Sequence, residues 1–174
     1  IPKDFYEYYN SNLVKFYEKF LDLIIKKHEF ELKKQPNYLS NYNPRLNSNI
    51  NGWIDWSLSS KNILRFINAF DDPYKGSITM MNKKKVRIKK VQLHGGETSN
   101  HPYSNALVLR NDEKWIVVGL NSERHTLLIS EVLDTNNKNI VKNIKVGDRF
   151  YSPIKKLETA KRIRAKFKLQ GIKK

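Results

Sequence analysis

Apolar side chains recur every three or four residues along the first thirty positions, which is the period of an amphipathic α-helix. The repeat begins just after Asp4, whose carboxylate can accept hydrogen bonds from the free amides of a first helical turn, and it fades near residue 31. One long helix over residues 4–31 is therefore predicted. Its apolar face contains Phe5, Tyr9, Leu13, Phe16, Phe20 and Ile24. Helically spaced aromatic residues form a core more often than a ligand groove, so we expect further protein to cover this face.

The next segment, residues 32–52, is rich in Asn, Pro, Tyr and Ser. Pro36 and Pro44 prevent a continuous helix there, and we interpret the segment as a linker. Its tyrosines and leucines give it side chains to pack, so it is not predicted to be freely flexible. We expect the pair Trp53 and Trp56 to pin the end of the linker to the element that follows.

A second helical repeat occupies residues 63–70, where apolar positions again advance in steps of three and four. Ser59 or Ser60 can cap its first turn through a side-chain oxygen. Pro73 and Gly76 stop it after Phe70. The pattern predicts a short helix that presents one apolar face to a core.

After this helix the pattern changes to short runs rich in β-branched residues, separated by turn residues. The predicted strands are 77–81, 86–93, 105–110, 114–120, 126–133 and a short one at 149–151. Five or six short strands entered through one helix fit a small closed barrel of the oligonucleotide-binding type. The fold class predicted for the chain is α+β.

Charge narrows the choice of partners. The chain has 33 Lys and Arg residues against 17 Asp and Glu, a net charge of +16. Such a protein is drawn to polyanions such as RNA, anionic membranes or nucleotides. A coding bias toward AT-rich codons would also enrich Lys, Asn and Ile, so charge alone does not name the partner. No cysteine is present, which excludes disulfides and thiolate sites and suits a reducing compartment; the cytoplasm is the expected location.

The last twenty residues, 155–174, contain nine Lys or Arg residues against a single acidic residue, Glu158. They form either a basic helix that grips a phosphate backbone or a solvated surface helix or tail. Elsewhere, no apolar run approaches the roughly 18 residues that span a bilayer. The four histidines are scattered without metal-ligand spacing, so no metal site is expected.

The junction between linker and second helix carries a sequence motif. Gly52 is followed by Ile54, Asp55, Trp56 and Ser57, and the helix contains Arg65, Phe66, Ile67, Ala69 and Phe70 before the turn with Pro73 and Gly76. This order resembles the junction and second domain of the folate-dependent formyltransferases, the family of methionyl-tRNA formyltransferase and the nucleotide-sugar N-formyltransferases. The resemblance covers roughly residues 40–153. It includes a Pro-Arg pair that ends at Arg45 and a closing Gly-Asp turn at Gly147.

The resemblance implies a division into four parts. Residues 1–31 would be the last helix of an N-terminal catalytic domain, residues 32–56 the interdomain linker, residues 57–153 the barrel, and residues 154–174 a basic extension. In that family an Asn, a His and an Asp of the N-terminal domain surround the formyl carbon of 10-formyltetrahydrofolate. Their motif does not occur in this chain. Its nearest imitation, around His101, lacks the required spacing and is interpreted as an ordinary turn.

Two sets of residues are predicted to have specific roles. The cations Lys83, Lys84, Lys85, Arg87, Lys89 and Lys90 form a basic hairpin. In methionyl-tRNA formyltransferase the second domain presents a basic surface to tRNA, so this hairpin is the candidate acceptor or nucleic-acid surface; the alternative is a solvated turn. Arg45, Trp53, Asp55 and Trp56 are assigned a structural role between the domains.

Asp55 stands between two tryptophans, where an apolar setting would raise its pKa and favour a catalytic role. We prefer a structural role, in which its carboxylate accepts backbone amides of the linker. Arg45 and Arg65 are its candidate ion partners.

These inferences combine into one functional hypothesis. The chain is interpreted as the C-terminal part of a 10-formyltetrahydrofolate-dependent N-formyltransferase, which moves a formyl group onto a primary amine of methionyl-tRNA or of a nucleotide-linked amino sugar. This part would supply acceptor binding and domain packing, and the missing catalytic domain would bind the folate. The alternative is a non-enzymatic nucleic-acid-binding module with the same type of barrel.

Overall fold

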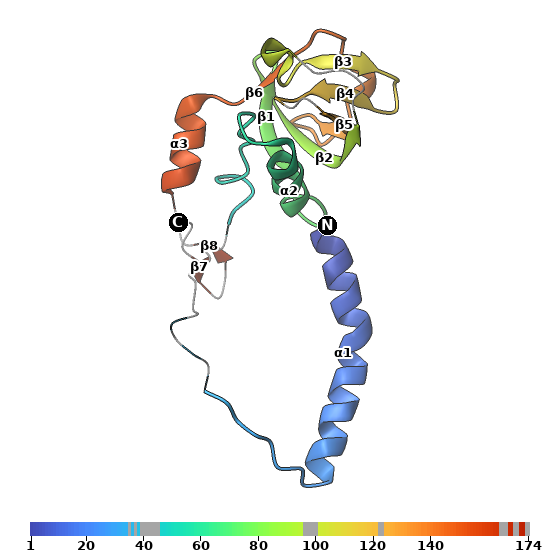
Figure 1. The fold of residues 1–174 in the computed structure, drawn as a ribbon, viewed down its shortest axis with the longest axis vertical. Coiled ribbons are helices and arrows are strands. Elements are labelled where there is room, and N and C mark those ends of the chain that lie inside the picture. Colours follow the sequence, from blue (N-terminus) through green and yellow to red (C-terminus); the bar gives the residue numbers. More distant parts are fainter. Residues whose placement is uncertain are drawn as a thin grey trace. The chain divides into compact units, whose positions relative to one another are not determined.

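The computed structural model describes residues 1–34, 36, 38, 46–95, 101–121 and 124–163, and the backbone of 167–168 and 171–172 (Figure 1). The chain divides into two compact units. One unit is Lys3–Pro44, and the other combines Ile1–Pro2 with Arg45–Lys174. Helices and an antiparallel sheet make up the described chain, which confirms the predicted α+β class.

Helix α1, Pro2–Ile25, is the long helix that the apolar repeat predicts, but it ends about six residues earlier than expected. Lys27 adopts a left-handed backbone with φ of 54°. The N–H of His28 then donates to the carbonyl of Leu23 at 2.9 Å, and the N–H of Lys27 donates to Ile24 at 2.9 Å. These two bonds form a Schellman motif, which terminates a helix. The sequence concealed this ending because a lysine stands where glycine is usual. None of the helix's residues is buried.

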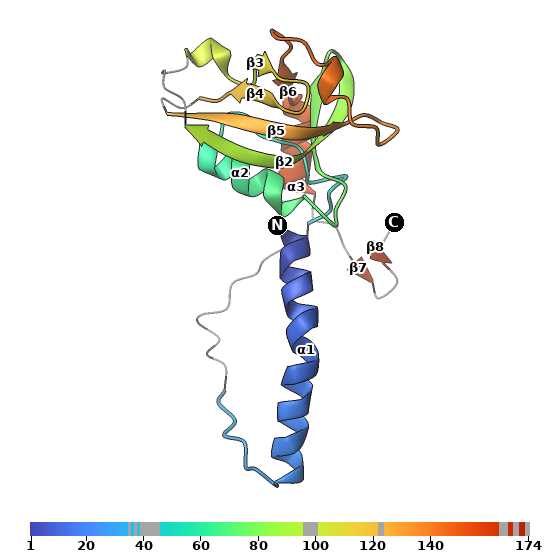
Figure 2. The ribbon, with the colours of Figure 1, turned by 90° about the vertical axis from the view of Figure 1, so that its right-hand side faces the viewer.

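The second unit is built on a six-stranded antiparallel sheet (Figures 1 and 2). Its strands are β1 Ser77–Met81, β2 Lys84–Gly95, β3 Val108–Asn111, β4 Ile116–Gly119, β5 His125–Leu133 and β6 Phe150–Tyr151. Their order across the sheet is β3-β4-β5-β2-β1-β6. Every predicted strand is present; β1 has the predicted bounds, and the ends of the others shift by at most three residues. The two short 3-10 turns are η2, Pro102–Ser104, and η3, Val141–Asn143.

The two outer edges of this sheet meet. The N–H of Val108 donates to the carbonyl of Asp148 at 2.8 Å, and the N–H of Phe150 donates to Ala106 at 2.8 Å. An antiparallel bridge between Leu107 and Arg149 lies between these bonds. The sheet therefore curls until the chain before β3 pairs with the chain before β6, which removes most of its open edge.

Helix α2, Ser60–Ala69, packs against β2 (Figure 2). Its Ile63 and Ile67 are fully buried and join the core inside the curled sheet, so the predicted apolar face is confirmed. The capping prediction is wrong in its detail. Ser59 is the N-cap residue, yet its side chain makes no capping bond, and its backbone carbonyl accepts the N–H of Ile63 at 2.9 Å.

The end of the linker is attached to the sheet. The N–H of Ile54 donates to the carbonyl of Ile78 at 2.9 Å, and the N–H of Ile78 donates to Gly52 at 2.6 Å. These residues pair with the first half of β1, while β6 pairs with its second half at Met80 and Met81. A Cβ on Gly52 would lie 2.4 Å from the carbonyl oxygen of Ser48, so no larger residue fits without a backbone shift.

The C-terminal segment begins with helix α3, Ile154–Arg162, inside the predicted basic extension. Two short strands, β7 Phe167–Lys168 and β8 Gly171–Ile172, pair antiparallel with each other and were not predicted. The Asn51 side chain caps the end of α3 by donating to the carbonyls of Ala160 at 2.9 Å and Ile163 at 3.2 Å. Among the described residues, no helix has the length and apolarity that a membrane crossing requires.

Candidate functional site: the basic hairpin and the junction pocket

The predicted basic hairpin is formed by β1 and β2, which a two-residue turn at Asn82 and Lys83 connects. Lys83, Lys84 and Lys85 lie at its tip and are exposed. Across the described chain their ammonium groups take part in no hydrogen bond or ion pair. These three cations are therefore free to meet an anion.

Arg87 and Lys89 do not belong to that exposed surface, which corrects the expectation that the whole run faces solvent. Alternation along β2 places them on the face opposite Val86 and Ile88. The linker and the turn after α2 cover that face, so the two cations are only 8% and 7% exposed.

Both buried cations have partners. Arg87 donates from Nη1 to the carbonyl of Gly76 at 2.9 Å and from Nη2 to Oδ1 of Asn49 at 2.6 Å. Burial lowers the pKa of the Arg87 guanidinium from its ordinary value. Lys89 is hydrogen-bonded to Asp72, and its Nζ lies 3.7 Å from Oδ1 of the buried Asp71. These cations stabilise the packing of the linker and the turn against β2.

Lys90 lies in a different environment from both the tip lysines and the two buried cations. With φ of 52°, it interrupts the pairing of β2 with β5 at this one position, and the register of the two strands is the same on both sides. Its half-exposed side chain reaches Glu131 on β5, and Nζ lies 2.9 Å from Oε2. The hydrogen bond from Lys90 to Glu131 raises the pKa of Lys90. Lys90 is therefore engaged within the sheet, and the part of the predicted surface that is both exposed and unpaired among the described residues is reduced to three lysines.

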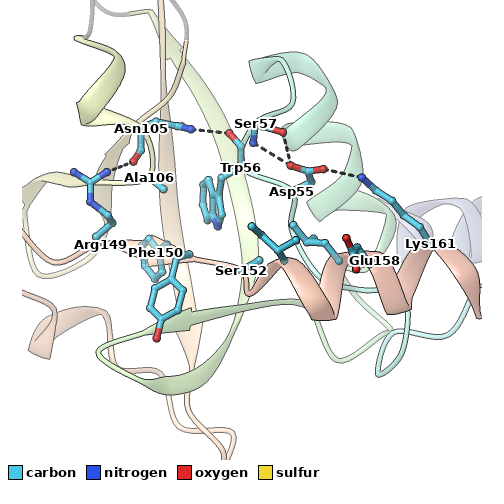
Figure 3. A pocket seen from close by; sticks show the side chains of 13 residues that line it. Asp55, Trp56, Ser57, Asn105, Ala106, Arg149, Phe150, Ser152, Glu158 and Lys161 are labelled. Carbon is cyan, nitrogen blue, oxygen red and sulfur yellow. Dashed lines mark hydrogen bonds and ion pairs between the residues drawn. The ribbon is translucent and has the colours of Figure 1, made fainter.

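A pocket of about 610 Å³ lies where the end of the linker, the start of β3, strand β6 and α3 meet (Figure 3). We call it the junction pocket. Asp55, Trp56 and Ser57 line one side, Asn105 and Arg149 another, and the α3 residues Leu157, Glu158 and Lys161 a third. Three residues of the motif that carries the family resemblance thus line a defined cavity.

Trp56 forms the floor of this pocket. Its ring stacks on Phe150 with centroids 5.7 Å apart and planes 15° from parallel. Its Nε1 donates to Oγ1 of Thr79 at 3.0 Å, and that hydroxyl donates to the carbonyl of Tyr151 at 3.0 Å. Trp53 also pairs with β1, through Ile78. The tryptophan pair pins the linker to the sheet, and not to the following helix as the sequence suggested.

Asp55 is held by Ser57 and Lys161, and among the described residues it has no contact with the predicted partner Arg65. Its Oδ1 accepts the Ser57 hydroxyl at 2.5 Å and the Ser57 N–H at 3.2 Å, and its Oδ2 lies 3.2 Å from Nζ of Lys161 on α3 (Figure 3). The hydrogen bond from the Ser57 side chain is the largest cause that lowers the pKa of Asp55. A lowered pKa contradicts the catalytic alternative, which needs a raised one. Arg45 lies outside the described residues.

Three further pocket residues were not predicted. Asn105 donates from Nδ2 to the carbonyl of Trp56 at 2.8 Å, and Arg149 donates to the carbonyls of Asn105 at 2.6 Å and Tyr103 at 2.5 Å. Lys161 binds Asp55 across 106 positions of sequence. No local pattern could have identified them, because each acts on a segment far away in the chain.

The remaining candidates from the sequence are His101 and a possible metal site. His101 caps η2 and accepts the N–H of Tyr103 on its Nδ1 at 3.2 Å, which confirms the predicted turn. Among the described residues, no group of three His, Asp or Glu side chains is placed to hold a metal ion.

Comparison with known proteins finds one protein family and a group of solved structures. No curated protein matches the chain at a significant level. Solved structures of HypX from Aquifex aeolicus are similar to it. A multiply substituted variant aligns over 71% of this chain and 19% of its own, with 18% identity and a TM-score of 0.47. HypX in complex with tetrahydrofolic acid aligns over 86% and 24%, with 15% identity and a TM-score of 0.45. The chain thus spans about a fifth of the length of these proteins.

The family model described as "Formyl transferase, C-terminal domain" matches residues 48–145, more than half of the chain. The matched region runs from the linker end through the junction motif, α2 and strands β1 to β5. It therefore contains both the wall of the junction pocket that Asp55 and Trp56 form and the whole basic hairpin. On this match, the chain belongs to the family of formyl transferase C-terminal domains.

Proposed function

We propose that this chain is the C-terminal part of a 10-formyltetrahydrofolate-dependent N-formyltransferase, and that it contributes acceptor binding and domain packing. The family match over residues 48–145 is the observation that carries the proposal. In this proposal the curled sheet is a barrel of the oligonucleotide-binding type, and the protein acts in the cytoplasm.

The chemistry of the described side chains supports a binding role. Formyl transfer to an amine needs one group that polarises the formyl oxygen and another that removes a proton from nitrogen. Asp55 is committed to Ser57 and Lys161, and its lowered pKa makes it a weak base. We therefore assign the reacting groups, and the folate, to an N-terminal catalytic domain.

Helix α1 fits the same proposal. It exposes aromatic side chains along its length, among them Phe5 and Phe16, which are 72% and 62% exposed. Exposed apolar faces of this size mark a protein contact. We propose that residues 1–31 complete the catalytic domain and that residues 32–56 connect it to the barrel.

The acceptor is proposed to carry phosphate. Lys83, Lys84 and Lys85 are exposed and unpaired within the described chain. Phosphate contacts from lysines position a nucleic acid or a nucleotide without reading its sequence. The acceptor amine would belong to methionyl-tRNA or to a nucleotide-linked amino sugar.

The test uses the full-length protein that contains this chain, purified and supplied with 10-formyltetrahydrofolate and each acceptor in turn. Formylated product is expected with one acceptor class. Replacing Lys83, Lys84 and Lys85 together by Gln is expected to raise KM for that acceptor about tenfold while kcat is kept, since the lysines bind and do not react. Absence of transfer to both acceptors would refute the proposal.

The same unpaired lysines favour one other candidate, a nucleic-acid-binding module without enzymatic activity. It predicts that these 174 residues alone bind RNA at low salt. Because phosphate binding releases counterions, the affinity would fall steeply as salt is added. Failure to retard an RNA oligomer in a gel at low salt would eliminate this candidate.

A further inference from the structure

A second hollow lies beside the tip of the β1–β2 hairpin, and two of the lysines that the proposed function assigns to the acceptor phosphate, Lys84 and Lys85, line it. It has a volume of about 550 Å³, within the usual range for small-molecule pockets. We call it the hairpin pocket. Its walls are the start of β2 and the loop that follows β5, between Asp134 and Asn143.

Strand geometry explains why this pocket exists. The pairing of β2 with β5 ends at Arg87 and Leu133, because the chain turns away at Asp134. Strand β2 nevertheless begins at Lys84, so its first residues pair with β1 alone within the described sheet. The N–H and C=O groups on the other edge of this stretch face the diverging loop. A groove with an unpaired strand edge is left between them.

The electrostatics of the pocket favour an anion. Lys84 and Lys85 line it, and their ammonium groups have no partner among the described residues. Exposed lysines stand within two residues of its lining at 83, 138, 142 and 145. Two aspartates lie nearby, and both are already hydrogen-bonded. Asp134 accepts the N–H groups of Asn136 at 2.8 Å and Lys138 at 2.9 Å, and Asp148 accepts Asn82 at 3.1 Å.

The floor of the pocket favours a flat apolar group next to that anion. Met81 and Val86 are 7% and 2% exposed, and Ile140 is partly buried against the core. A methionine thioether adapts well to a ring. The side-chain amides of Asn136 and Asn143 line the pocket without a partner in the described chain. Such amides can pair with the edge of a nucleobase.

The turn beside the pocket gives an independent indication. Asn82 and Lys83 have φ angles of 48° and 63°, the geometry of a two-residue hairpin turn in which the second position favours glycine. A lysine there is strained, and strained residues cluster at ligand sites. Lys83 therefore puts an exposed cation between the pocket residues Asn82 and Lys84, where glycine would be the stable choice.

We propose that the hairpin pocket binds a nucleoside phosphate, with the phosphate on Lys84 and Lys85 and the base on the floor that Met81, Val86 and Ile140 form. One nucleotide, and not a polymer, is the ligand that matches a pocket of this volume. The inference rests on the proposed function in assigning a phosphate to Lys84 and Lys85, but its test is separate, since a nucleotide can bind this chain whether or not formyl transfer occurs.

The test measures binding to the 174-residue chain by calorimetry. The probes are ADP, GDP, CDP, UDP, adenosine, pyrophosphate and an RNA oligomer. At least one diphosphate is expected to bind about tenfold more tightly than pyrophosphate and than the nucleoside alone, because only it uses both parts of the pocket. Amide NMR shifts on binding are expected at residues 82–86 and 134–143.

The variant is K84Q combined with K85Q, and its matched control is K61Q combined with K114Q, which removes the same charge from exposed lysines outside the pocket lining. The pocket variant is expected to lose about tenfold or more in affinity and the control less than twofold. Equal losses in the two would overturn the proposal. So would binding of pyrophosphate as tight as that of every diphosphate, or binding of the RNA oligomer alone. Thermal melting of both variants checks that each is folded.

Discussion

Lys83, Lys84 and Lys85 at the hairpin tip differ from Arg87 and Lys89 in what surrounds them, although all five cations stand within seven positions of one another. The tip lysines are exposed and unpaired within the described chain. Arg87 and Lys89 are buried against the linker and the turn after α2, with Asn49, Gly76, Asp71 and Asp72 as partners. The run of positive charge therefore contains two kinds of cation. The tip lysines are exposed and available to a ligand, whereas Arg87 and Lys89 are paired within the fold.

The physical difference lies in desolvation. An exposed ammonium keeps its water, so it contributes little to folding but can still bind an anion. A buried cation has lost its water, and the loss is offset only while its partners remain in place. Mutations in the two regions should therefore act on different measurements: stability for the buried pair, and ligand binding for the tip.

The largest effect is expected from Lys89→Met. The change leaves the carboxylate of Asp71, 1% exposed, without its buried counter-charge. Breaking a buried pair in this way costs about 3–5 kcal/mol. Urea unfolding of the chain would measure the loss, with Lys61→Met on the exposed face of α2 as the control. A loss below about 1 kcal/mol would contradict the contrast between the two regions.

Arg87→Met is expected to follow, with a loss of about 2–3 kcal/mol in the free energy of unfolding, because two charge-assisted hydrogen bonds disappear in a buried place. Arg149→Met is a matched comparison. Arg149 also donates two hydrogen bonds, but it is exposed and water can replace them. If both variants lose the same amount, burial is not the deciding factor.

A smaller and pH-dependent effect is expected from Asp55→Asn in the junction pocket. The folded state holds the pKa of Asp55 below its ordinary value of 3.8, chiefly through the hydrogen bond from Ser57. The stability that the carboxylate contributes is therefore present above the unfolded pKa and is lost as pH falls through the folded pKa. At pH 7 the variant should be about 1 kcal/mol less stable than the original chain.

The pH dependence of Asp55→Asn is read from urea unfolding of both proteins between pH 7 and pH 2. Their difference should shrink once the pH falls below about 3.8 and vanish at lower pH. A gap that widens in acid would mean that the carboxylate is destabilising in the folded protein.

The smallest effect has the opposite sign. Lys83→Gly should stabilise the chain by about 0.5 kcal/mol, because glycine relieves the left-handed strain at φ of 63° and loses part of that gain to its greater chain entropy. The same variant should weaken nucleotide binding, since it removes a cation that stands between the pocket residues Asn82 and Lys84. Thermal melting measures the first effect and calorimetry the second. Lys85→Gly, in extended strand, is expected to destabilise instead.

Much of the fold could be predicted because its causes are local. Alternation and turn residues located all six strands, and the steps of three and four residues found α2 with Ile63 and Ile67 on its buried face. Where local signals were weak, prediction failed. Helix α1 ends at a left-handed Lys27, where a glycine would have signalled the end. The β7–β8 pair was not indicated by any sequence pattern that we recognised.

The candidate sites were predicted less completely because their contacts join distant segments. The junction motif pointed to Asp55 and Trp56, but Lys161, Arg149 and Asn105 reach the pocket only when the sheet edges meet. The hairpin pocket depends on the position at which β5 stops pairing with β2, and residue types in the sequence do not indicate that position.

The sequence by itself determined the elements, the family and the charge of this protein, since periodicity, turn chemistry and motif spacing act over a few residues. Only the tertiary structure decided which cations remain in water. Burial is a property of what packs against a side chain, and the covering groups at Asp71, Asp72 and Asn49 come from other parts of the chain. Lys84 and Arg87, three positions apart, therefore carry the same charge in water in one case and buried among partners in the other.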